Sequence, residues 1–211
     1  MTASPVAVWL NTSFAAFDAA VAVYVHRLYE LAPQFFTPFF EFISFLGKGG
    51  IFLIILSILL ILFKKTRRYG TAMLLALAIG ALFTNCFLKI VIARPRPYTD
   101  TSSIFYSLWQ TVNMHVESDK SFPSGHTCAA FAAMTAVFFV GNKKYSWTAF
   151  IFAILMGVSR VYLVVHYFTD VLGGMVVGII AGCIGYVISI RLPRVWYNWE
   201  VPHGKRLEPT E

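Results

Sequence analysis

Long apolar runs separated by short polar segments are the dominant pattern along the chain. A helix needs about 20 mostly apolar residues to cross a bilayer. Runs near this length predict membrane-spanning helices over residues 49–63, 69–93, 126–142, 145–165 and 171–190. A weaker run covers residues 14–31, where Asp18 interrupts the apolar pattern. It is expected either to span the membrane as well or to lie in the interface, and the Pro- and Phe-rich segment 32–47 is expected at the membrane surface.

The composition supports a membrane protein with an all-α fold. Hydrophobic residues make up 58% of the 211 residues and charged residues 13%, against about 25% charged residues in a typical soluble domain. A soluble protein of this length would need a charged surface around its core, and this chain has too few charges to form one. With the weaker run included, we predict a polytopic bundle of six transmembrane helices in a single domain over residues 1–211.

The basic residues indicate which side of the membrane each loop faces. The net charge is +7, but its distribution follows the ends of apolar runs and does not indicate a nucleic-acid partner. In a six-helix bundle the basic regions 64–68, 143–144 and 191–206 fall on one side. Short basic loops remain cytoplasmic. Both termini are therefore predicted in the cytoplasm, and residues 94–123 and 166–170 on the extracytoplasmic face of a plasma (inner) membrane.

The last apolar run carries Gly174, Gly178 and Gly182. Their spacing places them on one helix face, and small residues on such a face let two helices approach closely in lipid. The pattern predicts close packing of this helix rather than a site for chemistry.

Ionisable residues that topology does not explain are costly in a membrane, and they gather in three segments. The first contains Lys89 and Arg96, which on a continuous helix would lie about 10 Å apart along the axis. Pro95 and Pro97 prevent that continuity. The helix is expected to end near Arg94, so that the chain can return Arg96 toward Lys89. The alternative is a snorkelling lysine beside an ordinary basic cluster.

The second segment is Pro123-Ser124-Gly125-His126, at the start of an apolar run. A helix start presents unpaired N–H groups and the positive end of the helix dipole, which attract anions. Gly125 lets an anion approach the backbone, and His126 places an imidazole beside it. The alternative is a plain helix cap with an uninvolved histidine.

The third segment runs from Ser159 to Asp170. His166 and Asp170 are four residues apart, so on a helix they share one face. The carboxylate can then hold one imidazole nitrogen and leave the other free to attack. Arg160 and His166 converge only if the helix breaks between them or if they reach a ligand from different heights. The alternative is an interfacial arginine and a histidine that its aspartate satisfies.

The three segments together match a phosphoryl group. Their fixed charges are Lys89, Arg96, Arg160 and Asp170, three positive and one negative, which sum to +2 with neutral histidines. A phosphate monoester carries about −1.5 to −2 at neutral pH. Without such an anion the cations would repel one another.

These segments resemble the signature of the type 2 phosphatidic acid phosphatase superfamily of membrane lipid phosphatases, whose motifs are K-x6-R-P, P-S-G-H and S-R-x5-H-x3-D. All three motifs are complete and in order between residues 89 and 170. Phe168 stands where a proline is common in relatives, and this departure affects no catalytic position.

The resemblance implies a role for each motif residue. His166 would be the nucleophile that forms a phosphohistidine, Asp170 would orient it, and His126 would protonate the leaving oxygen. The phosphoryl oxygens would be held by Lys89, Arg96, Ser124, Gly125 and Arg160. No carboxylate cluster of the kind that holds Mg²⁺ is visible, so a metal-independent reaction without a cofactor is expected.

A site at the outer membrane boundary suits a lipid phosphate whose tail stays among the membrane lipids. The candidates are undecaprenyl pyrophosphate, phosphatidylglycerophosphate, phosphatidate and diacylglycerol pyrophosphate. An external site in a short chain favours undecaprenyl pyrophosphate if the source is bacterial. Loop 98–121 is expected to help select the lipid. Its His115, Glu117 and Asp119 are candidates, although surface preferences favour solvated loop residues.

Other function classes remain open. A lipid phosphotransferase would pass the phosphoryl group from the same intermediate to another lipid. A non-catalytic phospholipid-binding membrane protein would be expected to lack His166 or His126, and this chain keeps both. Vanadium haloperoxidases share the site architecture but are soluble. Nothing in the pattern indicates an oligomeric state.

Overall fold

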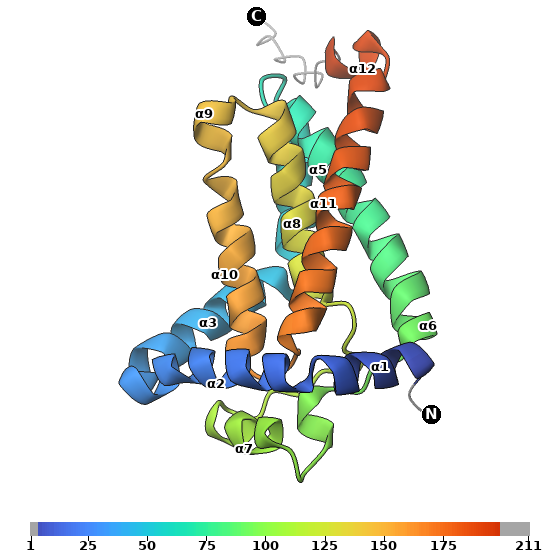
Figure 1. Cartoon of the computed structure of the whole chain (residues 1–211). Helices are drawn as coiled ribbons and strands as arrows, with labels where there is room; N and C mark the ends of the chain where they lie inside the picture. The colour runs from blue at the N-terminus through green and yellow to red at the C-terminus, as the bar shows by residue number, and fades with distance from the viewer. Residues whose placement is uncertain (1–3, 199–211) are drawn as a thin grey trace, which may run out of the picture.

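The computed structural model describes residues 4–198, and all regular structure within them is helical (Figure 1). The helices are α1 (Pro5–Ser13), α2 (Ala15–Leu31), α3 (Pro33–Gly47), α4 (Ile51–Leu62), α5 (Arg67–Ala81), α6 (Lys89–Ile92), α7 (Ile104–Thr111), α8 (Gly125–Val140), α9 (Lys143–Ser146), α10 (Ala149–Tyr162), α11 (Phe168–Arg191) and α12 (Arg194–Asn198). Short 3₁₀ turns cover Lys48–Gly50 and Pro97–Thr99, and a π-helical segment, Leu82–Leu88, joins α5 to α6. The predicted all-α fold is confirmed.

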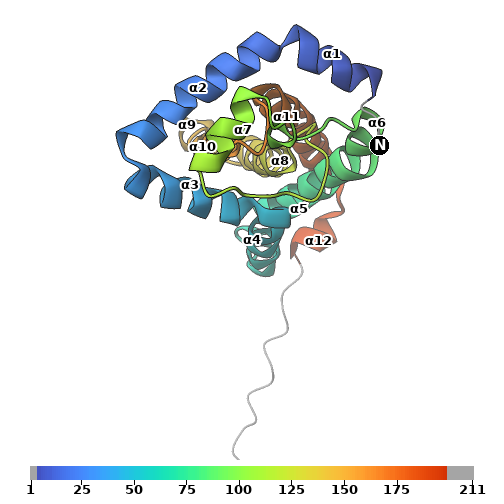
Figure 2. The ribbon, with the colours of Figure 1, turned by 90° about the horizontal axis from the view of Figure 1, so that it is seen from below.

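The long helices form a bundle around α8 (Figures 1 and 2). α8 contacts α5, α10 and α11, and α11 also packs along α5. The five strong apolar runs are all helical, as α4, the stretch from α5 to α6, α8, α10 and α11. Because the π-helical segment continues α5 into α6, one long element carries Lys89 to the lower end of the bundle in Figure 1.

Small residues bring α11 against α8. A Cβ atom on Gly174 would lie 2.5 Å from the Ser124 carbonyl oxygen, and one on Gly178 would lie 2.6 Å from the Cys128 carbonyl oxygen. At Gly182 an added Cβ would lie 2.5 Å from a side-chain carbon of α8. The predicted packing ridge is confirmed. It fixes the first turn of α11 beside the first turn of α8, and so positions two of the three motif segments.

A belt formed by α1, α2 and α3 crosses the lower end of the bundle, and α7 lies below it in Figure 1 and within its outline in Figure 2. α1 and α2 are bent by 62° at their junction. α3 turns into α4 at Gly49 and Gly50, whose φ angles of 60° and 69° are readily adopted by glycine. The crosswise course of α3 is compatible with a position at the membrane surface.

The prediction of six membrane-spanning helices is not confirmed. Within residues 4–198, four helical stretches are long and apolar enough to span, and the α1–α2 pair adds a fifth only if it is counted as one span. The four stretches are Pro33–Leu62, Arg67–Thr99, Lys143–Tyr162 and Phe168–Arg191, and α8 is a shorter apolar helix. α2 lies across the bundle because Asp18, 1% exposed, is bound to groups at the bundle's end. Residues 14–31 thus run across the end of the bundle, as a helix in the interface would (Figure 1).

The basic segments lie at the end of the bundle opposite the belt. The connection from α4 to α5, α9 and α12 lie at the upper end in Figure 1, whereas α1, α6 and α7 lie at the lower end. Since α1 and α12 are at opposite ends, the prediction that both termini lie on one side is not confirmed. Lys205 and Arg206 lie outside the described residues.

Candidate active site

Three chain segments meet at the lower end of the bundle, inside the belt. They are α6 with the residues that follow it, the start of α8, and the stretch from the end of α10 to the first turn of α11 (Figure 1). They carry all eight predicted site residues: Lys89, Arg96, Ser124, Gly125, His126, Arg160, His166 and Asp170. Six of these are buried, and Gly125 and His126 are partly buried.

The end of α6 brings two cations together. Ala93 follows the helix with a φ of 50°, and Arg96 is extended before the 3₁₀ turn that begins at Pro97. Arg96 thereby returns toward Lys89, as predicted. Both the Lys89 ammonium and the Arg96 guanidinium contact the carboxylate of Asp119. The two cations therefore converge on one anion although they are seven residues apart.

The start of α8 faces these cations. The Ser124 hydroxyl oxygen accepts hydrogen bonds from the Thr127 hydroxyl at 3.0 Å and the Thr127 N–H at 3.4 Å. The Ser124 N–H donates to the Asp170 carbonyl at 3.0 Å, which joins the starts of α8 and α11. A Cβ atom on Gly125 would lie 3.5 Å from the Lys89 nitrogen. The positive end of the helix and the lysine thus favour an anion at the same place.

The chain breaks between α10 and α11, where residues 163–167 are not helical and Val164 has a φ of 53°. His166 therefore precedes α11, and the prediction that His166 and Asp170 share a helical face is wrong in this detail. They are still neighbours, because the chain curves into the first turn of α11. The break required for Arg160 and His166 to converge is present.

The imidazole of His166 lies between a guanidinium and a carboxylate. Arg96 Nη1 donates to His166 Nε2 at 2.9 Å, so the proton of the neutral ring is on Nδ1. Nδ1 is 3.4 Å from Asp170 Oδ2 and has no hydrogen-bond partner among the described residues. Burial, and then the charges of Arg96 and Arg160, lower the pKa of His166 well below its ordinary value. The ring is neutral at pH 7, with Nε2 toward the cations.

Asp170 is fully buried and multiply bound. Its Oδ1 accepts from Arg94 Nη1 at 2.6 Å. Its Oδ2 accepts from the Ser121 hydroxyl at 2.5 Å and from the Tyr167 N–H at 3.0 Å. These bonds fix the carboxylate on the Nδ1 side of the His166 ring.

Arg94 is a buried partner of Asp170 that the sequence pattern does not reveal, since the pattern places it only at a helix end. Its guanidinium is 3.1 Å from Asp18 Oδ2, donates to Thr169 Oγ1 at 2.7 Å and lies 3.8 Å over the Tyr167 ring. Asp18 also accepts from the Thr169 N–H and hydroxyl, each at 2.8 Å. An isolated carboxylate in an apolar run needs a partner, so Asp18 carried a signal, but nothing along the chain identifies that partner.

The loop before α8 supplies carboxylates to the site cations. Asp119 pairs with Lys89 and Arg96, and Glu117 pairs with Arg160. The interpretation of these two as solvated loop residues is therefore wrong, although the Asp119 side chain stays 48% exposed. Burial alone would raise the pKa of Asp119, but Lys89 and Arg96 lower it below its ordinary value. An oxyanion that binds all three cations must displace these carboxylates.

His115, the third candidate in this loop, contacts α3 instead. Its Nε2 is 2.8 Å from Glu41 Oε1, and the Asn113 side-chain amide donates to the same oxygen at 2.8 Å. These bonds attach the loop to α3. The position of His115 indicates a structural contact.

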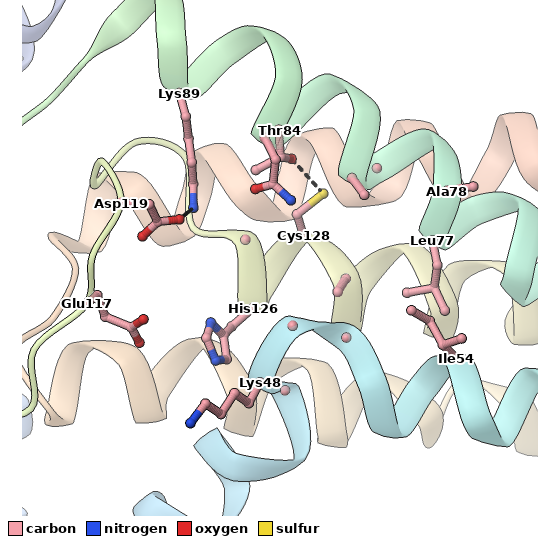
Figure 3. A pocket seen from close by; sticks show the side chains of 18 of the residues that line it. Lys48, Ile54, Leu77, Ala78, Thr84, Lys89, Glu117, Asp119, His126 and Cys128 are labelled. Atoms are coloured by element: carbon pink, nitrogen blue, oxygen red, sulfur yellow. Dashed lines mark hydrogen bonds and ion pairs between the residues drawn. The ribbon is translucent and has the colours of Figure 1, made fainter.

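A cavity of about 380 Å³ opens beside the charged groups (Figure 3). Lys89 and His126 line its polar end, and Ile54, Leu77 and Ala78 line the opposite end between α4 and α5. The cavity thus joins a site for an anion to an apolar groove. This arrangement suits an amphiphile with a phosphate head and an apolar tail.

The charged side chains here are arranged for anion binding. Within residues 4–198, no group of three or more His, Cys, Asp or Glu side chains is placed to hold a metal ion. The loop carboxylates beside the cavity each contact a lysine or arginine.

Comparisons with known sequences place this site in a family. The PAP2 superfamily profile matches residues 68–194, which is more than half of the chain and includes all three motif segments. Undecaprenyl-diphosphatase BcrC of Bacillus subtilis is 37% identical over 111 residues, 53% of each chain. Lipid A 4'-phosphatase of Porphyromonas gingivalis is 32% identical over 133 residues, 62% of this chain and 55% of the relative. The chain thus spans little more than half the length of these curated relatives.

Solved structures show the same fold. The crystal structure of a transmembrane PAP2-type phosphatidylglycerolphosphate phosphatase from Bacillus subtilis is 26% identical with a TM-score of 0.67, over 90% of this chain and 92% of the other. Aquifex aeolicus LpxE is 29% identical with a TM-score of 0.59, over 75% of this chain and 92% of the other. From the family match and the motif residues gathered at one site, this chain is a member of the PAP2 superfamily.

Proposed function

We propose that this chain is an integral membrane lipid phosphatase that releases phosphate from a lipid phosphate or diphosphate. The observation that carries the proposal is the convergence of Lys89, Arg96, Arg160 and His166 beside a cavity whose far end is apolar. The phosphate head would bind at the cations, and the tail would extend between α4 and α5. Residues 1–211 act as a single membrane-embedded domain in this proposal.

Undecaprenyl diphosphate is the favoured substrate. The relatives from Bacillus subtilis and Sulfolobus acidocaldarius, the latter 28% identical over 138 residues, are named undecaprenyl-diphosphatases. Other relatives are named for lipid A and phosphatidylglycerophosphate. All these names share a lipid phosphate, which is the chemistry that the cavity suits.

The reaction proceeds through a phosphohistidine. Nε2 of His166 attacks the terminal phosphorus, a P–N bond forms, and the P–O bond to the leaving group breaks with its electron pair on the oxygen. Asp170 stabilises the imidazolium that forms. In the complex with the anionic substrate, whose charge offsets the cations around His126, the protonated His126 gives its proton to the leaving oxygen. Water then attacks the phosphohistidine, with His126 accepting its proton, and inorganic phosphate is released.

Fixed cations stabilise the phosphoryl group during both steps. Lys89, Arg96, Arg160 and the start of α8 at Ser124 and Gly125 bind its oxygens, where negative charge is spread in the transition state. When the substrate binds, Arg96 exchanges its hydrogen bond to His166 for one to an oxygen of the phosphoryl group. Since these charges are built into the fold, the reaction requires no metal ion or cofactor.

The active site faces the extracytoplasmic side of the plasma (inner) membrane, which the chain crosses several times. Support comes from the basic segments 64–68 and 143–144, which lie at the end of the bundle opposite the site (Figure 1). Short basic loops remain in the cytoplasm. A long-chain lipid diphosphate in the outer leaflet would present its headgroup at the level of the site.

Phosphate release by the purified full chain in detergent and excess EDTA tests this function. The substrates are undecaprenyl diphosphate, phosphatidylglycerophosphate, phosphatidate and diacylglycerol diphosphate. We expect release from at least one, with the highest kcat/KM for undecaprenyl diphosphate. His166→Ala should release none, whereas the matched control His115→Ala should remain active.

Three outcomes would contradict parts of this account. Absence of release from every lipid would exclude the phosphatase activity. Transfer to an added lipid alcohol without free phosphate would indicate a phosphotransferase. Activity lost in EDTA and restored by Mg²⁺ would exclude the metal-independent reaction.

A further inference from the structure

Lys48 lies in the turn between α3 and α4, at the junction of two cavities. One is the cavity of about 380 Å³, and the other, of about 230 Å³, reaches Arg160. Among the described residues, three line both cavities: Lys48, Glu117 and His126. Lys48 is thus beside the histidine that faces the leaving group in the proposed reaction.

The turn that carries Lys48 is packed directly against His126. A Cβ atom on Gly47 would lie 2.7 Å from His126 Cδ2, so the backbone preceding Lys48 meets the edge of the imidazole. Figure 3 shows Lys48 and Lys89 on opposite sides of His126. The fold therefore fixes the position of the lysine backbone and leaves its side chain exposed toward the cavities.

The Lys48 ammonium differs from the other cations of this region. Lys89, Arg96 and Arg160 each contact a loop carboxylate. Lys48 has no hydrogen-bond or ion-pair partner among residues 4–198. Lys48 therefore provides a fourth positive charge, on the leaving-group side and separate from the three cations that surround the phosphoryl site.

We propose that Lys48 binds the leaving phosphate of a lipid diphosphate and so makes the site selective for diphosphates over monoesters. This inference rests on the proposed function, which places the terminal phosphoryl group next to His166. When the P–O bond breaks, its electron pair stays on the bridging oxygen, and the leaving group is a lipid monophosphate. His126 protonates that oxygen and Lys48 balances the remaining charge. A monoester releases a neutral alcohol, which offers Lys48 no anion.

A lysine near a membrane surface can also contact lipid headgroups in general. That role would affect all substrates alike, because it does not depend on the leaving group. Selectivity between a monophosphate and a diphosphate with the same tail distinguishes the two roles.

Farnesyl diphosphate and farnesyl monophosphate form such a pair for the full-length protein in detergent. Lys48→Met should lower kcat/KM for the diphosphate about tenfold or more, as expected for the loss of a charge-assisted contact. The monophosphate value should change by less than about twofold, which also shows that the variant is folded. Lys48→Arg should retain the diphosphate activity, and the matched control Lys65→Met, at the opposite end of the bundle, should change neither. An equal loss for both substrates, or no loss for the diphosphate, would overturn the inference.

A binding measurement separates this inference from the proposed function. Methylenediphosphonate, which is not hydrolysed, should raise the Tm of the wild-type protein more than methylphosphonate does, and Lys48→Met should remove that difference. If this holds while no phosphate is released from farnesyl diphosphate or from any of the four lipids of the substrate panel, the Lys48 site stands and the proposed function is wrong. If phosphate is released and neither Lys48→Met nor diphosphonate binding shows the expected difference, the inference is wrong and the proposed function stands.

Discussion

Arg94 holds Asp170 by a 2.6 Å hydrogen bond, and Asp170 lies beside the His166 ring. The orientation of the proposed nucleophile therefore depends on an arginine outside the motif positions. The same guanidinium contacts Asp18 of α2, so the belt and the active site share one buried ion-pair network. In a buried network of this kind, removing one charged partner leaves the remaining buried charges uncompensated, which is strongly destabilising.

Substitution of Arg94 by lysine tests this positioning role. Lysine keeps the positive charge but cannot bind several oxygens in the planar geometry of a guanidinium. We expect kcat to fall about 10- to 100-fold, the usual cost of losing an outer-shell partner, with KM little changed because the phosphoryl-binding cations remain. Steady-state phosphate release gives both constants. Arg68→Lys at the basic end is the matched control, and a raised KM with unchanged kcat would contradict the role.

The motif residues could be predicted because their identities and spacing are visible along the chain. Arg94 and Asp18 could not be paired, since they are 76 residues apart and neither belongs to a motif. Glu117 and Asp119 were candidates, but a polar loop gives no sign that its carboxylates fold back onto the cations. Such contacts depend on tertiary structure.

Two carboxylates of the loop between α7 and α8, Glu117 and Asp119, form ion pairs with the three site cations. Product phosphate must compete with these carboxylates. In the double variant Glu117→Gln and Asp119→Asn, we expect inorganic phosphate to inhibit more strongly, with a Ki lower by about tenfold, equivalent to about 1.4 kcal/mol. Inhibition of turnover by added phosphate provides the measurement.

Asp100→Asn serves as the matched control for the loop variant. This carboxylate belongs to the same polar region and binds Ser102 instead of a site cation. The Ki of the Asp100→Asn variant for phosphate should equal that of the wild-type protein. A Ki in the loop variant that stays the same or rises would show that the carboxylates assist phosphate binding.

Hydropathy along the chain predicts which segments are helices better than it predicts how each helix is oriented relative to the bundle. The strong runs are all helices, and the prolines after α6 end it where expected. The run over 14–31 was ambiguous because Asp18 could interrupt a span or mark a surface helix. Its buried contacts with Arg94 and Thr169 hold α2 across the bundle, and these partners lie far away in the sequence.

The arrangement of the whole molecule separates basic loops from the active site. Ser118, between α7 and α8, and Lys65, between α4 and α5, are both exposed, and these two connections lie at opposite ends of the bundle (Figure 1). Single cysteines at these two positions can report the orientation after the native cysteines are replaced. We expect an impermeant thiol reagent to label position 118 but not position 65 in intact cells, because short basic loops stay in the cytoplasm. Both positions should react after permeabilisation. Labelling of 65 alone in intact cells would reverse the orientation.

The identity of the phosphorylated residue shows whether His166 is the nucleophile. The full-length protein is mixed with farnesyl diphosphate labelled with ³²P at its terminal phosphate, quenched within milliseconds, and the labelled peptide is mapped. We expect an acid-labile phosphohistidine at His166, absent from His166→Ala, which should not turn over. Label on Ser124 or His126 in the wild-type protein, together with continued turnover by His166→Ala, would contradict the account.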